Sequence, residues 1–227
     1  AVTFESTRPF FGSKAFVSGN QVRPEFAESV ESRKESGANE DASGNSVFRV
    51  LVFGGSQGAH AINLAMVEAA SQLAASPLHL RLTHQTGERD VEMVRGAYRQ
   101  AGLEADVQPL LYDMGRQLGQ ADVVICRAGA TTLAEIAAAG KAAILVPLPT
   151  ATDDHQRRNA EALAAAGAAD VLLQHEMTGH ALAQRILALA SDRERRARMA
   201  SSAHQLARPH AAKVIVDRAM ELVERSG

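Results

Sequence analysis

Residues 50–66, VLVFGGSQGAHAINLAM, join an apolar run to a glycine-rich turn and then to a segment with helical spacing. The run VFRVLVF at residues 47–53 is typical of a buried strand. After Gly58, apolar residues recur on one helical face, at Ile62, Met66, Ala70 and Leu73. A strand that passes through glycines directly into a helix is the building unit of a parallel α/β sheet.

Strand-like and helix-like segments continue to alternate along the chain. Strands are expected at residues 78–84, 105–111, 122–130, 142–148 and 168–174, with helices at 87–103, 112–121, 131–140 and 152–167. Beyond Met177 the pattern is wholly helical, with Thr178 as an N-cap and Pro209 at the start of a last helix. The sequence therefore predicts an α/β fold, with a doubly wound, Rossmann-like parallel sheet and a helical C-terminal tail.

Composition limits the classes of function. The 227 residues are 46% hydrophobic and carry a formal net charge of -2, so no basic surface for nucleic acid is expected. The single cysteine, Cys126, cannot form an internal disulfide, which favours a reducing compartment. The start lacks the order of a secretory signal, and no apolar run is long enough for a membrane span. Residues 28–46 are polar and predict a flexible loop or linker.

Ligands of such sheets bind beyond the carboxyl ends of the strands, so the small-residue turns there are the first candidates. In GGSQGA, Gly54 and Gly55 permit backbone angles closed to other residues, Ser56 offers a hydroxyl, and Gly58 opens a helix whose N–H groups favour an anion. A phosphate site is one interpretation. A tight strand-to-helix turn without a ligand is the other, because the spacing is neither GxGxxG nor a P-loop.

The turn CRAGATTLAEI offers a second candidate. Gly129 and Ala130 leave room at a strand end, Thr131 or Thr132 can cap a helix, and Glu135 lies one turn further on. The carboxylate can accept both hydroxyls of a ribose. Alternatively, Glu135 is the capping-box partner of Thr132, three residues after the cap.

The third candidate is the cluster TDDHQRRNA. Asp153, Asp154 and His155 are consecutive and point in different directions from a helix start, so a metal site is disfavoured. The amide of Gln156 suits the hydroxyls of a neutral sugar, although Asp153 and Gln156 also fit a simple helix start.

Together the motifs GGSQGA, RAGATTLAEIAAAGKAAILVPLP and DDHQRRNA, with FVSGNQVRPEF near the start, resemble the C-terminal half of the MurG family. The resemblance implies the C-terminal half of a GT-B glycosyltransferase. It divides the chain into a remnant of the acceptor domain and crossing segment (1–20), a linker (21–46), a donor-binding domain (47–208) and a C-terminal helix (209–227). An N-terminal part is then missing.

The resemblance also implies site residues. The turn residues Gly55, Ser56 and Gln57 would meet the donor diphosphate, Glu135 the ribose hydroxyls, and the backbone of Leu111 the uracil edge. The other contacts would come from Arg23 near the nucleotide, from Gly129, Ala130 and Thr131 along the pocket, and from His155 and Gln156 at the sugar. The sequence departs from the family pattern twice, with Gln21 where proline is usual and Thr131 where leucine is frequent.

The activity implied is the inverting transfer of N-acetylglucosamine from UDP-N-acetylglucosamine to lipid I, giving lipid II in peptidoglycan synthesis, without a metal or other cofactor. The general base, the lipid I acceptor site and the membrane-contacting patch would belong to the N-terminal domain. The location implied is the cytoplasmic side of the bacterial membrane, bound peripherally.

Two other functions compete with this activity. One is a nucleotide-sugar-binding subunit of a split transferase, inactive unless partnered. The other, a nicotinamide-dependent oxidoreductase, is disfavoured because GxGxxG is absent after VLVFGG.

Overall fold

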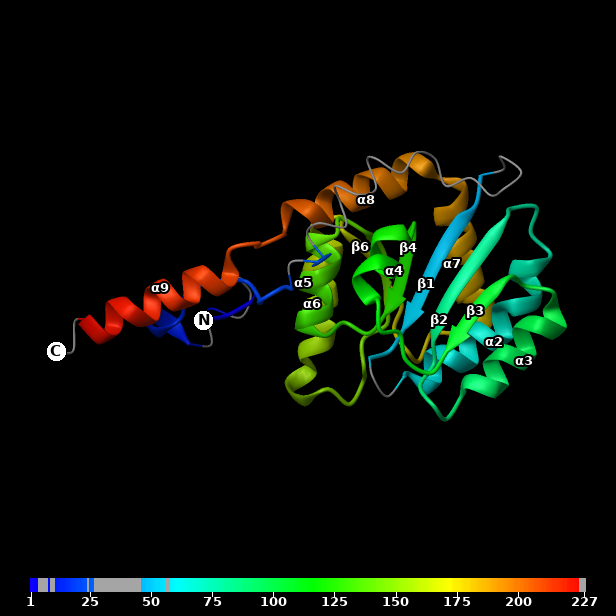
Figure 1. The fold of residues 1–227 in the computed structure, drawn as a ribbon, viewed down its shortest axis with the longest axis horizontal. Coiled ribbons are helices and arrows are strands. Elements are labelled where there is room, and N and C mark those ends of the chain that lie inside the picture. Colours follow the sequence, from blue (N-terminus) through cyan, green and yellow to red (C-terminus); the bar gives the residue numbers. More distant parts are fainter. Residues whose placement is uncertain (4–7, 9–10, 24, 27–45, 56–57, 225–227) are drawn as a thin grey trace.

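A computed structural model of the chain describes residues 1–3, 8, 11–23, 25–26, 46–55 and 58–224. In this part of the chain a six-stranded parallel sheet has the order β3-β2-β1-β4-β5-β6 (Figure 1). The strands are β1 (Phe48–Phe53), β2 (Leu80–Gln85), β3 (Ala105–Gln108), β4 (Val123–Cys126), β5 (Ala142–Leu145) and β6 (Ala169–Val171). The predicted α/β fold with a doubly wound sheet is confirmed, because the order reverses direction between β1 and β4.

Helices connect the strands and extend the chain beyond the sheet. They are α2 (His60–Ala74), α3 (Val91–Ala101), α4 (Met114–Gln120), α5 (Ala130–Ala138), α6 (His155–Ala165), α7 (Gly179–Ser191), α8 (Arg193–Gln205) and α9 (Ala211–Glu224). The described residues also include two 3-10 turns, η2 (Gly12–Lys14) and η3 (Thr152–Asp154). Thr178 caps α7 as predicted, since its hydroxyl accepts from the Ala181 N–H at 3.1 Å. The last helix begins at Ala211, two residues after Pro209.

Two hydrophobic cores lie on opposite faces of the sheet. One contains apolar side chains of α2, α3 and α7 packed on β1, β2 and β4, among them Ile62, Met66, Tyr98 and Ile186. The other contains side chains of α4, α5 and α6, with Phe26 from the N-terminal segment, against the opposite side of β1, β4 and β5. Because β4 and β5 are covered on both sides, every residue in them is buried, which explains their continuous apolar sequences.

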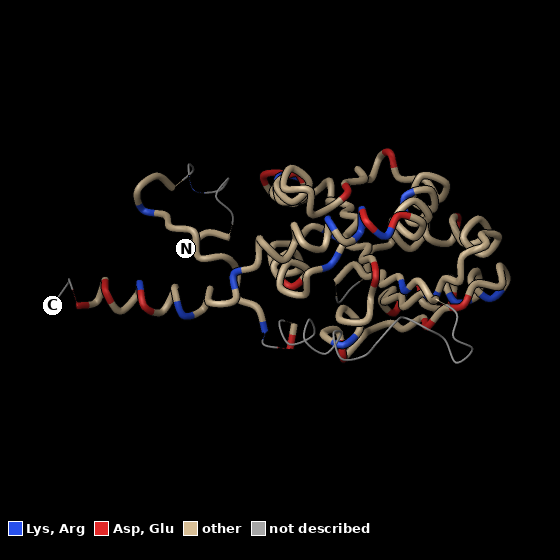
Figure 2. The backbone as a smooth tube through the Cα atoms, turned by 90° about the horizontal axis from the view of Figure 1, so that it is seen from above, with Lys and Arg blue, Asp and Glu red and all other residues tan. Residues whose placement is uncertain are grey.

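The two ends of the chain project together from the sheet domain. Figures 1 and 2 show both chain ends extending away from the sheet domain, and in Figure 1 they do so on the side of α5 and α6. Near the base of this projection, a Cβ at Gly19 would lie 2.5 Å from Cβ of Arg208, so the two segments pack closely there. Most of the predicted linker falls on residues 27–45, which lie outside the described residues.

Candidate functional site

The turns that carry the predicted site residues meet at one edge of the sheet. In the strand register, Phe53 at the end of β1 pairs with Gln85 of β2 and with Cys126 of β4, and Cys126 pairs with Leu145 of β5. The segments after these four residues therefore leave the sheet at the same level. Figure 1 shows this edge at the lower end of the strand arrows. Edges of this kind, beside the point where strand order reverses, are where α/β sheets bind ligands.

The glycine turn after β1 has two structural glycines and one that faces open space. A Cβ at Gly54 would lie 2.2 Å from Cβ of Ala59, and one at Gly58 would lie 1.9 Å from the Thr86 carbonyl oxygen. Gly58 also has φ +74°, and its N–H donates to the Gly55 carbonyl at 2.9 Å. Gly55 has φ +90°, and a Cβ there would meet no atom of the described residues within 4 Å. Only Gly55 therefore leaves its surface open to a ligand.

The helices that start at this edge have N-termini without side-chain caps. In α2 the N-cap is Ala59, and in α5 it is Gly129, and neither start has a side-chain hydrogen bond to its first N–H groups. By contrast, Asp192 caps α8 through the Arg195 N–H at 2.8 Å. Uncapped N-termini of this kind attract anions through their N–H groups and the helix dipole. Ser56 and Gln57, predicted at the diphosphate, lie outside the described residues.

The start of α5 excludes one of the two interpretations of Glu135. The expectation that Thr131 or Thr132 caps this helix is wrong, because the N-cap is Gly129. Glu135 then lies well inside the helix, beyond reach of the N-cap N–H, so it is not a capping-box partner. The tertiary structure begins the helix earlier than the local pattern indicated, and this leaves the Glu135 carboxylate available for another role.

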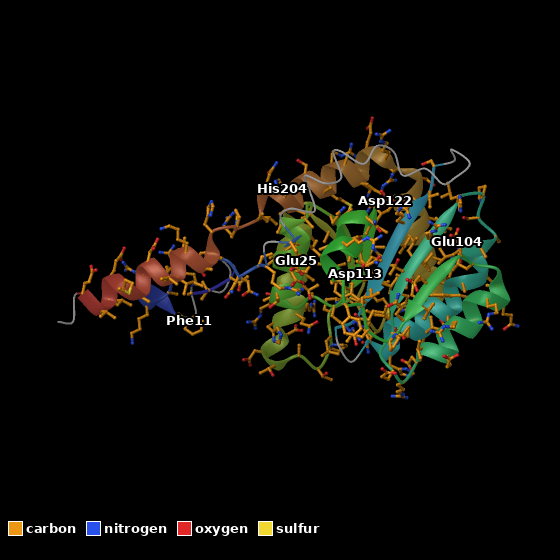
Figure 3. All side chains as sticks on the ribbon, viewed as in Figure 1. Phe11, Glu25, Glu104, Asp113, Asp122 and His204 are labelled. Atoms are coloured by element: carbon orange, nitrogen blue, oxygen red, sulfur yellow. The ribbon has the colours of Figure 1, made fainter. Side chains whose placement is uncertain are left out.

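The Glu135 carboxylate is half-enclosed and faces an arginine of the N-terminal segment. Its side chain is 15% exposed, and Oε1 lies 3.7 Å from the guanidinium of Arg23. Burial raises the pKa of Glu135 above its ordinary value; Arg23 opposes this and Glu25 adds to it. Arg23 itself lies over the Phe26 ring at 4.7 Å and pairs with Glu25 at 3.2 Å. Figure 3 shows Glu25 beside α5.

A chain of polar contacts ties the N-terminal segment to the first turn of α5. The Gln21 N–H donates to Oδ1 of Asn20 at 3.1 Å, and Nδ2 of Asn20 donates to the Thr131 hydroxyl at 2.9 Å. Thus Arg23 and Thr131, more than a hundred residues apart in sequence, lie at one site together with Glu135.

Leu111 is buried, and its N–H is already used. It donates at 2.9 Å to Oε1 of Gln85, a residue that sequence reasoning did not single out. Among the described residues, no donor reaches the Leu111 carbonyl, so this oxygen can still accept a hydrogen bond. The only sequence signal for Gln85 is a polar side chain at the carboxyl end of a buried parallel strand.

The predicted sugar residues follow η3. Asp153 and Asp154 have φ +52° and +54°, a strained conformation for residues other than glycine. His155 directs Nδ1 at the Thr152 carbonyl at 2.7 Å, so Nδ1 donates, and Nε2 has no partner among the described residues. The local pairing expected of Asp153 with Gln156 is absent from the contacts of these residues, since the N-cap of α6 is Asp154 without a side-chain bond.

The side chain of Gln156 instead joins two turns of the edge. Its Oε1 accepts from the N–H groups of Ala128 at 3.2 Å and Leu148 at 3.1 Å. Its Nε2 has no acceptor among the described residues and remains available to donate to a ligand. Arg127, also missed from the sequence, donates to the Val146 and Pro147 carbonyls at 3.1 and 3.2 Å and so holds the loop after β5.

The described residues contain no group of three or more His, Cys, Asp or Glu side chains placed to hold a metal ion. Nor does any helix in this part of the chain combine the length and apolar character needed to cross a bilayer.

Comparison with known proteins identifies relatives of this chain. Residues 49–215 match the profile of the glycosyltransferase family 28 C-terminal domain. The chain is 44% identical over 226 residues to the UDP-N-acetylglucosamine--N-acetylmuramyl-(pentapeptide) pyrophosphoryl-undecaprenol N-acetylglucosamine transferase of Pelobacter propionicus, covering 94% of this chain and 60% of that protein. The transferase of the same name from Trichlorobacter lovleyi is 49% identical over 178 residues, covering 78% of this chain and 47% of that protein.

Among solved structures, the crystal structure of Acinetobacter baumannii MurG superposes with a TM-score of 0.79 at 35% identity, covering 96% of this chain and 59% of that one. This chain thus spans no more than about three fifths of the length of these relatives.

Proposed function

Because the chain belongs to the glycosyltransferase family 28 C-terminal domains, of the MurG type, we propose that it binds UDP-N-acetylglucosamine as the donor half of a transferase. The complete enzyme would transfer N-acetylglucosamine to lipid I, giving lipid II. The observation that carries the proposal is the enclosed Glu135 carboxylate, with Arg23 at 3.7 Å, on a helix whose N-terminus is uncapped. A carboxylate for ribose and free N–H groups for phosphate are the two requirements of a nucleoside diphosphate.

The donor would lie along the edge formed by the ends of β1, β4 and β5. Its diphosphate would meet the open surface of Gly55 with Ser56 and Gln57, and the N–H groups of Ala130 and Thr131 after Gly129. The ribose hydroxyls would donate to Glu135, with Arg23 beside them. At the base, uracil N3–H would donate to the Leu111 carbonyl, since the N–H of that residue serves Gln85. His155 Nε2 and Gln156 Nε2 would contact the sugar hydroxyls.

The proposed chemistry is a displacement with inversion. The C4 hydroxyl of the muramoyl sugar forms a bond to the anomeric carbon, while the bond from that carbon to the β-phosphate oxygen breaks. The hydroxyl proton goes to a general base, and the electron pair leaves with UDP. Helix N-termini stabilise the charge that develops on the diphosphate, so this step requires no metal.

We assign the base and the lipid acceptor site to a second domain. Supporting this, the projecting end of the molecule carries apolar surface: Phe11 is 58% exposed, and α9 exposes Val214, Val216, Met220, Leu222 and Val223. Such a patch is typical of a surface that another protein unit covers. Figure 3 shows Phe11 well away from the sheet. Of the other aromatic residues among positions 1–18, Phe16 is partly buried, and Phe4 and Phe10 lie outside the described residues.

In this proposal residues 1–20 are a remnant of the acceptor domain and crossing segment, 21–46 are a linker, 47–208 bind the donor, and 209–227 form the C-terminal helix. The complete enzyme would lie peripherally on the cytoplasmic side of the bacterial membrane. The same exposed patch also favours a second candidate, a donor-binding subunit whose acceptor domain is a separate chain.

Calorimetry tests donor binding. UDP and UDP-N-acetylglucosamine should bind, and equal weak binding of UDP, ADP and GDP would exclude the uridine assignment. Turnover of a soluble lipid I analogue tests whether sugar transfer requires a second domain. The chain alone should be inactive and should gain activity when the N-terminal domain of a relative is added in trans or fused. Robust transfer by the chain alone would mean that the base is within it, with His155 the first residue to examine.

A further inference from the structure

Gln85 joins two loops of the proposed donor site through one side chain. Its Nε2 donates at 2.7 Å to the Gly55 carbonyl in the glycine turn, and its Oε1 accepts at 2.9 Å from the Leu111 N–H in the loop after β3. The residue is only 3% exposed. Both polar atoms of the carboxamide are therefore used, and each holds the backbone of a residue assigned to a different part of the donor.

The position from which this side chain extends is itself held by buried polar contacts. The neighbouring His84 lies between the Tyr98 hydroxyl, at 2.7 Å, and Oδ1 of Asn63, at 3.0 Å. Burial lowers the pKa of His84 to about 3, so the ring is neutral at physiological pH. Nδ2 of Asn63 in turn donates to the Thr86 carbonyl at 2.9 Å. These contacts hold the end of β2 against α2 and α3, and so fix the backbone position from which the Gln85 side chain extends.

Backbone contacts also hold the two loops against the end of β2. Gly58 packs directly on the Thr86 carbonyl, so the glycine turn lies on residues 85 and 86. On the other side, the Thr86 N–H donates to the Gln108 carbonyl and the Gly87 N–H to that of Pro109, both at 3.0 Å. Neither of these contacts reaches Gly55 or Leu111. Of the side-chain contacts of the described residues, the Gln85 carboxamide is the one that spans these two positions.

We propose that Gln85 is a positioning residue that couples the phosphate-binding and base-binding parts of the donor site. The inference rests on the proposed function, because it takes Gly55 and Leu111 as donor contacts. By fixing the spacing of the two loops before the ligand arrives, Gln85 lets both parts of one nucleoside diphosphate bind at once. Its contribution therefore appears for a ligand that spans both parts and not for either fragment, because a fragment needs only one loop.

The test compares UDP with its fragments in Gln85→Met, which keeps the length of the side chain and removes both hydrogen bonds. UDP should bind about 10- to 100-fold more weakly than to the unchanged chain, as expected for two lost hydrogen bonds. Uridine alone and inorganic pyrophosphate alone, followed by NMR titration, should each change less than about threefold, which corresponds to less than one hydrogen bond.

Gln108→Met is the matched control. Gln108 pairs with Gln85 in the register of β2 and β3, but its Nε2 donates only to Asp106 at 2.8 Å, on the exposed surface. UDP affinity should be unchanged in this variant. As a second variant, Gln85→Glu keeps the acceptor for the Leu111 N–H and loses the donor to Gly55. It should weaken UDP as well, and it provides the comparison if Gln85→Met folds poorly.

The outcomes distinguish a failure of the proposed function from a failure of the coupling role of Gln85 alone. If the unchanged chain does not bind UDP, the proposed function fails and the role of Gln85 fails with it. If the unchanged chain binds UDP and folded Gln85 variants bind it equally well, only the coupling is overturned. Equal losses for UDP, uridine and pyrophosphate also overturn the coupling, because they indicate a general loosening of the fold.

Discussion

Replacing Glu135 by alanine should weaken UDP binding by one to two orders of magnitude. Hydrogen bonds to a charged acceptor contribute about 1.5–3 kcal/mol, and each 1.4 kcal/mol is about tenfold in affinity. The structure gives little reason to expect that Glu135→Ala lowers the free energy of unfolding. Alanine is the best helix former, and Glu135 makes no capping bond in α5. Its partner Arg23 is 59% exposed and can be solvated once the carboxylate is gone.

The assay is calorimetry with UDP and with 2′,3′-dideoxy-UDP, which lacks the hydroxyls assigned to Glu135. The unchanged chain should lose affinity for the dideoxy compound by about the factor that Glu135→Ala loses for UDP. The variant should bind the two compounds equally, because the carboxylate and the hydroxyls form one interaction and cannot be lost twice.

Glu161→Ala supplies the control, since Glu161 is a helical glutamate whose ion pair with Arg157 is exposed at the surface. Such a pair contributes little, and UDP affinity should not change. The assignment is refuted if Glu135→Ala binds UDP as tightly as the unchanged chain. It is also refuted if the variant still distinguishes UDP from the dideoxy compound.

Other perturbations test neighbouring parts of the structure. Glu135→Gln should be more stable than the unchanged chain at pH 8. Because the pKa of Glu135 is raised in the folded chain, its contribution to the free energy of unfolding is complete below pH 4.5 and is lost as pH rises through the raised pKa. The advantage of glutamine should therefore vanish in thermal melts at acid pH. Gly58→Ala should cost about 3 kcal/mol or more in urea titrations, because its Cβ would lie 1.9 Å from Thr86 oxygen, whereas Gly96→Ala, in open space within α3, should be neutral or stabilising. Gln156→Ala should weaken UDP in competition titrations, since Oε1 of Gln156 holds two turns of the edge, and should weaken UDP-N-acetylglucosamine more, since Nε2 is assigned to the sugar hydroxyls; equal losses for the two ligands would contradict the sugar contact. Gln21→Pro and Thr131→Leu should each lower the free energy of unfolding by about 0.5 kcal/mol, and their combined effect should be smaller than the sum if both break one chain of contacts.

Much of the fold was accessible from the sequence, because the alternation of strand and helix patterns is a local signal that burial imposes on each segment. The glycine turn after β1 was readable only in part: positive φ was correctly expected at Gly55, but the second positive φ is at Gly58 and not at Gly54, where glycine is needed because a Cβ would lie 2.2 Å from Cβ of Ala59. The roles of Gln85 and Arg127 could not be predicted from the sequence, because their contacts depend on strand register. The error at Thr132 has the same origin: TLAE fits a capping box locally, but the chain enters α5 from β4 and starts the helix at Ala130.

Gln21 and Thr131, the two departures from the family pattern, form contacts with Asn20 that only the folded chain reveals. Proline at position 21 would have no N–H, and leucine at position 131 would have no hydroxyl. In this chain the Gln21 N–H orients the Asn20 amide through Oδ1, and the same amide donates through Nδ2 to the Thr131 hydroxyl. Each departure therefore supplies one end of the contact chain that Asn20 completes, and either alone would leave the amide with one partner fewer. Seen separately in the sequence, they only weaken the resemblance to the family. In the folded chain they fasten the segment that carries Arg23 to the helix that carries Glu135.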